Sequence, residues 1–146
     1  MVTAKKGVPC ARGRWSAEDI RSSMLLYAVT DRAWLQGRSL ADCVREAIEG
    51  GVTFVQLREK SAGHDEAALL ARELKAVCAE AGVPFVIDDD VALAAEVGAD
   101  GVHVGQSDMA CAEARRILGE QAIVGVSAQT VDEALAAQAA GADYLG

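Results

Sequence analysis

The sequence predicts an α/β fold in which parallel strands alternate with helices, and three observations support this class. From residue 24 onward, short β-rich runs alternate with longer runs of helical periodicity. The joints from helix to strand repeat a glycine-containing pattern, GGVTFV, AGVPFV, GADGVHV and GADYLG, in which glycine can take the positive φ that ends a helix. Aromatic residues make up only 4% of the chain, which disfavours a β-sandwich. Because parallel neighbours need long crossovers, the sheet should be covered by helices.

The predicted elements form a (βα)₅β series. The predicted strands are residues 24–30, 53–59, 84–88, 101–105, 123–128 and 143–146, and the predicted helices lie at 39–51, 64–82, 90–99, 110–119 and 130–142. Three helix starts carry capping residues, namely Ser39, Asp90, and Thr130 with Glu133 three positions later. An eight-fold barrel normally needs about 250 residues. The sheet is therefore expected to be either open or part of an incomplete barrel.

Residues 1–23 differ in character from the rest of the chain. They contain five cations, two acids, two glycines and a proline, with little periodicity. We therefore expect a basic, flexible N-terminal arm at 1–23 and a partial (βα) barrel domain at 24–146. An organelle-targeting segment is the alternative for the arm, but its helical amphipathicity is poor.

The composition limits the classes of partner. The formal net charge is −8, which disfavours nucleic-acid binding because a phosphate groove needs clustered cations. No apolar run approaches the roughly 18 residues of a membrane span, and no secretory signal is apparent. We therefore expect a cytoplasmic protein that acts on small molecules, without nucleic-acid or membrane partners.

Polar residues gather where the predicted strands end, which is where parallel α/β folds collect ligands. Period-two alternation places Gln56, Arg58 and Lys60 on one side of the second strand. Two cations and an amide facing a common point favour an anionic ligand such as a phosphate or pyrophosphate. The alternative is a surface ion pair of Arg58 or Lys60 with Glu59 or Asp65.

Carboxylates follow the third and fourth strands. Asp90 is expected to cap the next helix, which leaves Asp88 and Asp89 without a structural explanation. Asp108 lies 19 residues after Asp89, at the mouth of the neighbouring strand. Parallel strands lie about 4.8 Å apart, so Asp89 and Asp108 can share one Mg²⁺. The alternative for Asp108 is the N-cap of the helix that follows.

Two further side chains stay open in function. His103 lies in the middle of a strand and is expected to be a hydrogen-bonded core histidine, because no second His or Cys accompanies it. Ser127 ends the fifth strand and can either meet a ligand or start the turn before Thr130.

Read together, the strand ends resemble a known family. The segments LYAVTD, FVQLREK, FVIDDDVALAAEVGADGVHVGQSDM and VGVSAQTVDEALAAQAAGADYLG resemble thiamine-phosphate synthase, a TIM (β/α)₈-barrel transferase. The likeness covers residues 24–146, and VQLREK and GADGVHVGQSDM are its specific signals. It implies an incomplete barrel of about five βα units plus a sixth strand.

The resemblance also implies an activity and a set of site residues. The family joins an aminopyrimidine methyl diphosphate to a thiazole phosphate, with release of pyrophosphate, in thiamine biosynthesis. The matching positions are Gln56, Arg58 and Lys60 as pyrimidine-diphosphate contacts, Asp89 and Asp108 as Mg²⁺ ligands, and Ser127 as a substrate-binding serine. Arg58 and Lys60 are the expected catalytic residues, because they would stabilise the charge that grows on the departing pyrophosphate.

Three departures from the family pattern affect the prediction. Asp88 is a further expected substrate-binding residue, but it stands where the family usually has Asn, and its charge would repel a pyrophosphate unless it is protonated or faces the metal. Gln129 stands where a tautomerase branch of the family has His, which speaks against that branch. The sequence ends before the family's Thr/Ser/Lys phosphate loop. We therefore expect this chain to bind Mg²⁺ and pyrimidine diphosphate with little or no turnover.

Two alternatives remain from other classes. One is a non-catalytic, phosphate-binding or regulatory half-barrel that dimerises to close its sheet. The other is a thiazole tautomerase-like protein. In the incomplete barrel, unpaired edges at the first and sixth strands would favour association into homo-oligomers.

Overall fold

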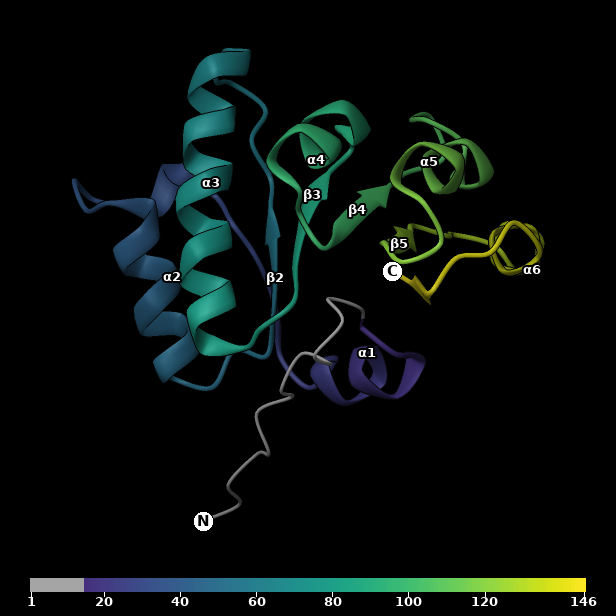
Figure 1. Ribbon diagram of the computed structural model, residues 1–146, viewed down its shortest axis with the longest axis horizontal. Coiled ribbons are helices and arrows are strands. Elements are labelled where there is room, and N and C mark those ends of the chain that lie inside the picture. The colour runs from purple at the N-terminus through teal and green to yellow at the C-terminus, as the bar shows by residue number, and fades with distance from the viewer. Residues whose placement is uncertain (1–14) are drawn as a thin grey trace.

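The protein is a curved, parallel sheet with helices on its outer side (Figure 1). The computed structural model describes residues 15–146. Its elements are α1 (Ala17–Ser23), β1 (Tyr27–Val29), the 3₁₀ helix η1 (Arg32–Trp34), α2 (Leu40–Glu49), β2 (Phe54–Leu57), α3 (His64–Ala81), β3 (Phe85–Asp88), α4 (Val91–Val97), β4 (Gly101–Val104), α5 (Cys111–Leu118), β5 (Ile123–Val126), α6 (Val131–Ala139) and β6 (Tyr144–Leu145). The predicted alternation of strands and helices from residue 24 onward is confirmed.

The six strands lie in chain order, and every neighbouring pair is parallel. Their register places Asp88, His103, Gly125 and Tyr144 in one row across β3 to β6. The sheet curves enough that the hydroxyls of Tyr27 in β1 and Tyr144 in β6 lie 2.8 Å apart. This is the geometry of an incomplete barrel, as expected.

The larger part of the core lies between the sheet and the outer helices. Outward-facing strand residues such as Val55, Leu57 and Val102 pack against α2 to α5, where Leu74 and Ala71 of α3 are almost fully buried. Small side chains let the helices approach the sheet closely. The abundance of alanine in the sequence agrees with a layer of small side chains between the helices and the sheet.

A smaller core fills the inner, concave side of the sheet. It consists of Phe54, Val86 and Ile123 from three strands, with Trp15 and Ile20 from the N-terminal segment. Trp15 is 8% exposed and Ile20 is 5% exposed. The expected flexible arm does not describe residues 15–23, because Trp15 and, in helix α1, Ile20 are buried in this core. Residues 1–14 lie outside the described part of the chain.

Helix α1 has its own start signal, which the sequence analysis overlooked. The Ser16 hydroxyl accepts a hydrogen bond from the Asp19 N–H, and the Asp19 carboxylate accepts one from the Ser16 N–H, which forms a capping box. Such a cap stabilises a short helix that is otherwise only marginal.

The predicted caps of the later helices are confirmed, with one difference. Ser39, Asp90 and Thr130 each accept a backbone hydrogen bond from the residue three positions later. The Glu133 carboxylate, however, receives the N–H of Gln129 rather than that of Thr130. Helices α3 and α4 end at Gly82 and Gly98 with φ values of 66° and 62°, as the repeated joints predicted.

The edges of the sheet leave apolar side chains open to solvent. In the part of the chain that the structure describes, β1 and β6 each pair with one strand only. Leu26 and Val29 beside the first edge, and Leu145 at the other, are each about half exposed. Among the helices of residues 15–146, none combines the length and the apolar character needed to cross a bilayer.

Candidate functional site

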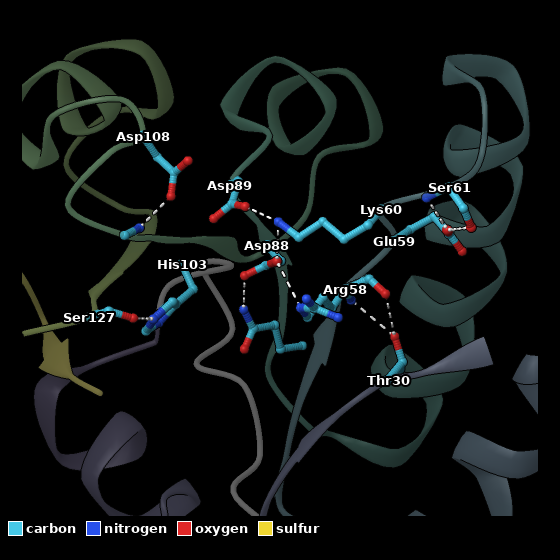
Figure 2. A network of polar contacts seen from close by, with 12 residues as sticks. Thr30, Arg58, Glu59, Lys60, Ser61, Asp88, Asp89, His103, Asp108 and Ser127 are labelled. Atoms are coloured by element: carbon cyan, nitrogen blue, oxygen red, sulfur yellow. Dashed lines mark hydrogen bonds and ion pairs between the residues drawn. The ribbon is translucent and has the colours of Figure 1, made fainter. Parts of the chain in front are cut away.

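The candidate site lies at the carboxyl ends of β2, β3 and β4 (Figure 2). Strand β2 ends at Leu57, and alternation sends Gln56 toward the concave side, where it is 5% exposed. Arg58 and Lys60 follow directly and are each about half exposed. The structure thus brings together the amide and the two cations that the sequence predicted.

These three side chains converge on Asp88, at the end of β3. The Gln56 Nε2 group donates to Asp88 Oδ1 at 2.6 Å, and Lys60 Nζ lies 3.0 Å from Asp88 Oδ2. Arg58 Nε lies 3.8 Å from the same oxygen. The charge of Asp88, which the sequence analysis expected to need protonation or a metal, is therefore compensated by cations of the chain itself.

The alternative pairing of Arg58 or Lys60 with Glu59 is wrong. Alternation sends Glu59 to the other side of the strand, where its carboxylate lies 3.2 Å from Arg32 and accepts the N–H groups of Ser61 and Ala62. Neither cation has an ion pair with Asp65 either, among the residues that the structure describes. Both cations are left on the concave side.

Asp89 adopts an unusual backbone conformation at the end of β3. Its φ is 60°, in the left-handed region that non-glycine residues rarely enter. Its N–H donates to the carbonyl of His103 at 2.8 Å, and its carboxylate forms an ion pair with Lys60. This conformation separates the roles of the adjacent acids, because it leaves Asp90 free to cap α4 while Asp89 stays at the sheet edge.

Asp108 lies beside β4, at the same edge of the sheet as Asp89 (Figure 2). Its Oδ2 accepts the N–H of Gly105 at 2.7 Å, which ties the carboxylate to the end of the strand. The alternative role as the N-cap of α5 is wrong, because Ala110 occupies that position and the helix has no side-chain cap. Asp89 and Asp108 thus come from neighbouring strand ends, as the sequence predicted.

The two acids suit one Mg²⁺ in their chemistry. A hard cation of this kind takes one or two protein carboxylates and completes its shell with water and substrate phosphates. Within residues 15–146, no cluster of three or more His, Cys, Asp and Glu side chains could hold a metal by itself. The carboxylates of Asp89 and Asp108 are ligands of the type that such a cation accepts.

A row of inner side chains connects this ionic cluster to Ser127. The Ser127 hydroxyl lies 2.8 Å from His103 Nε2, and His103 Nδ1 lies 3.0 Å from the hydroxyl of Tyr144. The Tyr144 hydroxyl meets that of Tyr27, which donates to Gln56 Oε1 at 3.2 Å. The expectation of a buried, hydrogen-bonded His103 is confirmed, with the added finding that its partners belong to the site.

The two tyrosines are the site-lining residues that sequence reasoning missed. Tyr144 reaches His103 across Gly125 of the intervening strand, where a Cβ would lie 2.1 Å from the tyrosine ring. Glycine inside a strand often marks such a close approach. The GVS segment of the fifth strand carried this signal, but the partner could be recognised only from the sheet register.

Burial and ion pairing shift the protonation of the site in opposite directions. Burial lowers the pKa of His103, although Asp88, Asp89 and Asp108 oppose this effect, so the ring is neutral near pH 7. Hydrogen bonds to Asp89 and Asp88 raise the pKa of Lys60. Burial raises the pKa of Tyr27 to about 12 and also raises that of Tyr144. Lys60 is therefore charged, and both tyrosines keep their hydroxyl hydrogens.

Fold and site together define a protein of the (βα)-barrel class whose polar site lies at the carboxyl ends of the strands. The model of the thiamine monophosphate synthase (TMP-TENI) family matches residues 26–146. The chain therefore belongs to this family.

Individual relatives agree with the family assignment. A thiamine-phosphate synthase of Clostridium novyi is 50% identical over 121 residues, which are 83% of this chain and 59% of that protein. One of Syntrophomonas wolfei is 48% identical over 127 residues, 87% of this chain and 61% of that protein. The solved thiamine phosphate pyrophosphorylase of Pyrococcus furiosus superposes with a TM-score of 0.80 and 39% identity, covering 87% of this chain and 61% of the other. The chain thus spans about three-fifths of the length of these relatives.

Proposed function

We propose that the chain carries the diphosphate and metal part of a thiamine-phosphate synthase site. The reaction would transfer an aminopyrimidine methyl group from its diphosphate ester to the nitrogen of a thiazole phosphate and release pyrophosphate. The observation that supports the proposal is the ion-pair cluster of Arg58 and Lys60 with Asp88 and Asp89, with Asp108 at the same edge of the sheet (Figure 2). The family assignment supports the same reaction class.

The charge balance of the cluster argues for a divalent cation. The cations Arg58 and Lys60 stand against the carboxylates of Asp88, Asp89 and Asp108, so the five groups sum to −1. A diphosphate would be repelled by this sum, because like charges at short range are unfavourable. One Mg²⁺ reverses the sign to +1. Binding of the anion and of the metal should therefore depend on each other.

Each site residue has a role in this proposal. Arg58 and Lys60 would contact the diphosphate and stabilise the negative charge that grows on it as the carbon–oxygen bond breaks. Asp89 and Asp108 would hold Mg²⁺, which supplies Lewis-acid stabilisation of the same departing group. Gln56 and Ser127 would orient the pyrimidine, and Asp88 would position Gln56 and Lys60 through its two oxygens.

Lys60 must change partners for this to happen. In the structure it contacts both Asp88 and Asp89. Its side chain is about half exposed, so these ion pairs contribute little to stability and can be exchanged for a phosphate contact. Mg²⁺ at Asp89 would replace the positive charge that Lys60 withdraws. The lysine thus links metal binding to diphosphate binding.

The test is calorimetric titration of the 146-residue chain with pyrophosphate, with and without Mg²⁺. We expect the affinity to fall about tenfold or more without Mg²⁺, the effect of losing one charged contact of about 1.5–3 kcal/mol. The double change Asp89→Asn and Asp108→Asn should remove the Mg²⁺ dependence. Asp132→Asn, at an exposed position in α6, is the matched control and should leave it intact. Pyrophosphate binding that is indifferent to Mg²⁺ would instead support a non-catalytic phosphate-binding protein.

Turnover is a separate question from binding. The chain matches about three-fifths of its relatives' length, so we expect coupling of the two substrates to be slow or absent in these 146 residues alone. Release of pyrophosphate can be measured for this chain and for a form extended with the segment of a relative that follows the matched part. Equal rates would contradict the expectation, without affecting the binding proposal.

A further inference from the structure

The hydrogen bonds of the inner row form one unbroken chain from an anion to a hydroxyl. Its members lie in β1 to β4, in β6 and directly after β5, and all of them are buried or half-buried. In order they are Asp88, Gln56, Tyr27, Tyr144, His103 and Ser127. Most of these groups can either donate or accept. The direction of donation along this row of hydrogen bonds is therefore set by the groups at its two ends.

Asp88 sets the direction at one end. A carboxylate only accepts hydrogen bonds, and Asp88 pairs with the Lys60 ammonium at 3.0 Å. The Gln56 side chain must then turn its NH₂ group to Asp88 and its carbonyl oxygen to Tyr27. The reverse amide orientation would place two oxygens against each other at 2.6 Å.

Each tyrosine passes the direction on, because a hydroxyl has only one hydrogen. The Tyr27 hydroxyl donates its one hydrogen to Gln56 Oε1, so its oxygen must accept a hydrogen bond from the Tyr144 hydroxyl. The Tyr144 hydroxyl donates its own hydrogen to Tyr27, so its oxygen must accept a hydrogen bond from His103 Nδ1. The imidazole ring is thus required to carry its hydrogen on Nδ1.

We propose that the chain from Asp88 holds neutral His103 as the Nδ1–H tautomer and thereby fixes the Ser127 hydroxyl as a donor to Nε2. Free histidine prefers the other tautomer, with the hydrogen on Nε2, so the neighbours impose this state. Tyr27, Tyr144 and Gln56 act as positioning residues. Ser127 is left with only lone pairs to offer to a ligand at the strand ends.

This polarity selects the kind of group that Ser127 can bind. A ligand N–H or O–H finds an acceptor there, whereas a ring nitrogen or carbonyl that needs a donor does not. The consequence for ligands rests on the proposed function, in which Ser127 meets the substrate. The tautomer of His103 does not rest on the proposed function, because it follows from contacts within the protein.

The experiment is ¹⁵N NMR of the histidine rings of the 146-residue chain, recorded without ligand at pH 8, where the His103 ring is neutral. The protein has two histidines, and His64→Gln assigns the signals of His103. We expect a protonated Nδ1 and an unprotonated Nε2. Because no ligand is present, the result is independent of whether the transferase activity exists.

The decisive variant is Tyr27→Phe. It keeps the ring that stacks on Phe54 at 4.6 Å but removes the oxygen that accepts from Tyr144. Tyr144 can then turn its hydrogen to His103 Nδ1, and the proton of the ring should move to Nε2. Gln56→Met, which removes the acceptor of Tyr27, should cause the same exchange and serves if Tyr27→Phe does not fold.

Ser127→Ala is the matched control at the other end of the chain. It removes a partner of the same ring, yet the direction set from Asp88 remains, so Nδ1 should stay protonated. An unmodified protein with the hydrogen on Nε2, or Tyr27→Phe and Gln56→Met variants that both keep it on Nδ1, would overturn the inference.

Discussion

Helix α1 offers a sharp test of how the inner core is built. Ile20 is 5% exposed and packs in the cluster with Phe54, Val86 and Ile123, below the polar row of the site. Truncating a buried isoleucine to alanine typically costs about 2–5 kcal/mol. The greater helix propensity of alanine returns only about 0.5 kcal/mol. We therefore expect Ile20→Ala to lower the free energy of unfolding by about 3 kcal/mol.

The assay is urea unfolding followed by circular dichroism at low protein concentration. With a slope of about 2 kcal/mol per molar urea, the loss corresponds to a midpoint about 1.5 M lower. Leu25→Ala is the matched control, because Leu25 lies five positions further on and is 73% exposed. Leu25→Ala should change the free energy of unfolding by less than about 0.5 kcal/mol. Equal, small effects of both changes would refute the docking of α1 and restore the interpretation of residues 15–23 as an arm.

Two further predictions follow from the site and its surroundings. Burial raises the pKa of Glu59, but hydrogen bonds from Ser61, Arg32 and Ala62 outweigh it and hold the pKa at about 2. The Glu59 carboxylate therefore stabilises the fold fully at pH values above 4.5, its ordinary pKa. This contribution is lost as the pH falls from 4.5 toward 2. Glu59→Gln should flatten the fall of the unfolding free energy over that window, and an unchanged slope would contradict the assignment. The second prediction concerns the sheet edges: the half-exposed Leu26 and Val29 should make the chain self-associate, as a concentration-dependent elution volume in sizing chromatography. Leu26→Lys with Val29→Lys should reduce this association, whereas a compact monomer at every concentration would argue against it.

Much of the fold could be predicted because its signals are local. Period-two and helical patterns define the strands and helices, and Ser39, Asp90 and Thr130 mark three helix starts. Helix α1 was not predicted because it is short and has few apolar residues. Its stability comes from Trp15 and Ile20 in a core whose other members are distant in the chain.

The candidate site, too, could be predicted only in part from the sequence. Alternation alone places Gln56, Arg58 and Lys60 on one side of their strand, and the structure confirms that they converge. The partner on which they converge, Asp88, could not be predicted, because the strand register decides it. For Asp108, an N-cap and a position at the strand end were equally compatible with the spacing, and the backbone of the loop after β4 decided between them.

The sequence by itself determined the class of fold, the edge of the sheet at which the chemistry lies, and the residue types gathered there. These properties depend on periodicity and on neighbours within a few positions. The tertiary structure alone decided that Tyr27 and Tyr144, from the two outer strands, meet through the curvature of the sheet. Hydrogen-bond direction and charge compensation arise between residues more than 20 positions apart, so only the packed chain could define them.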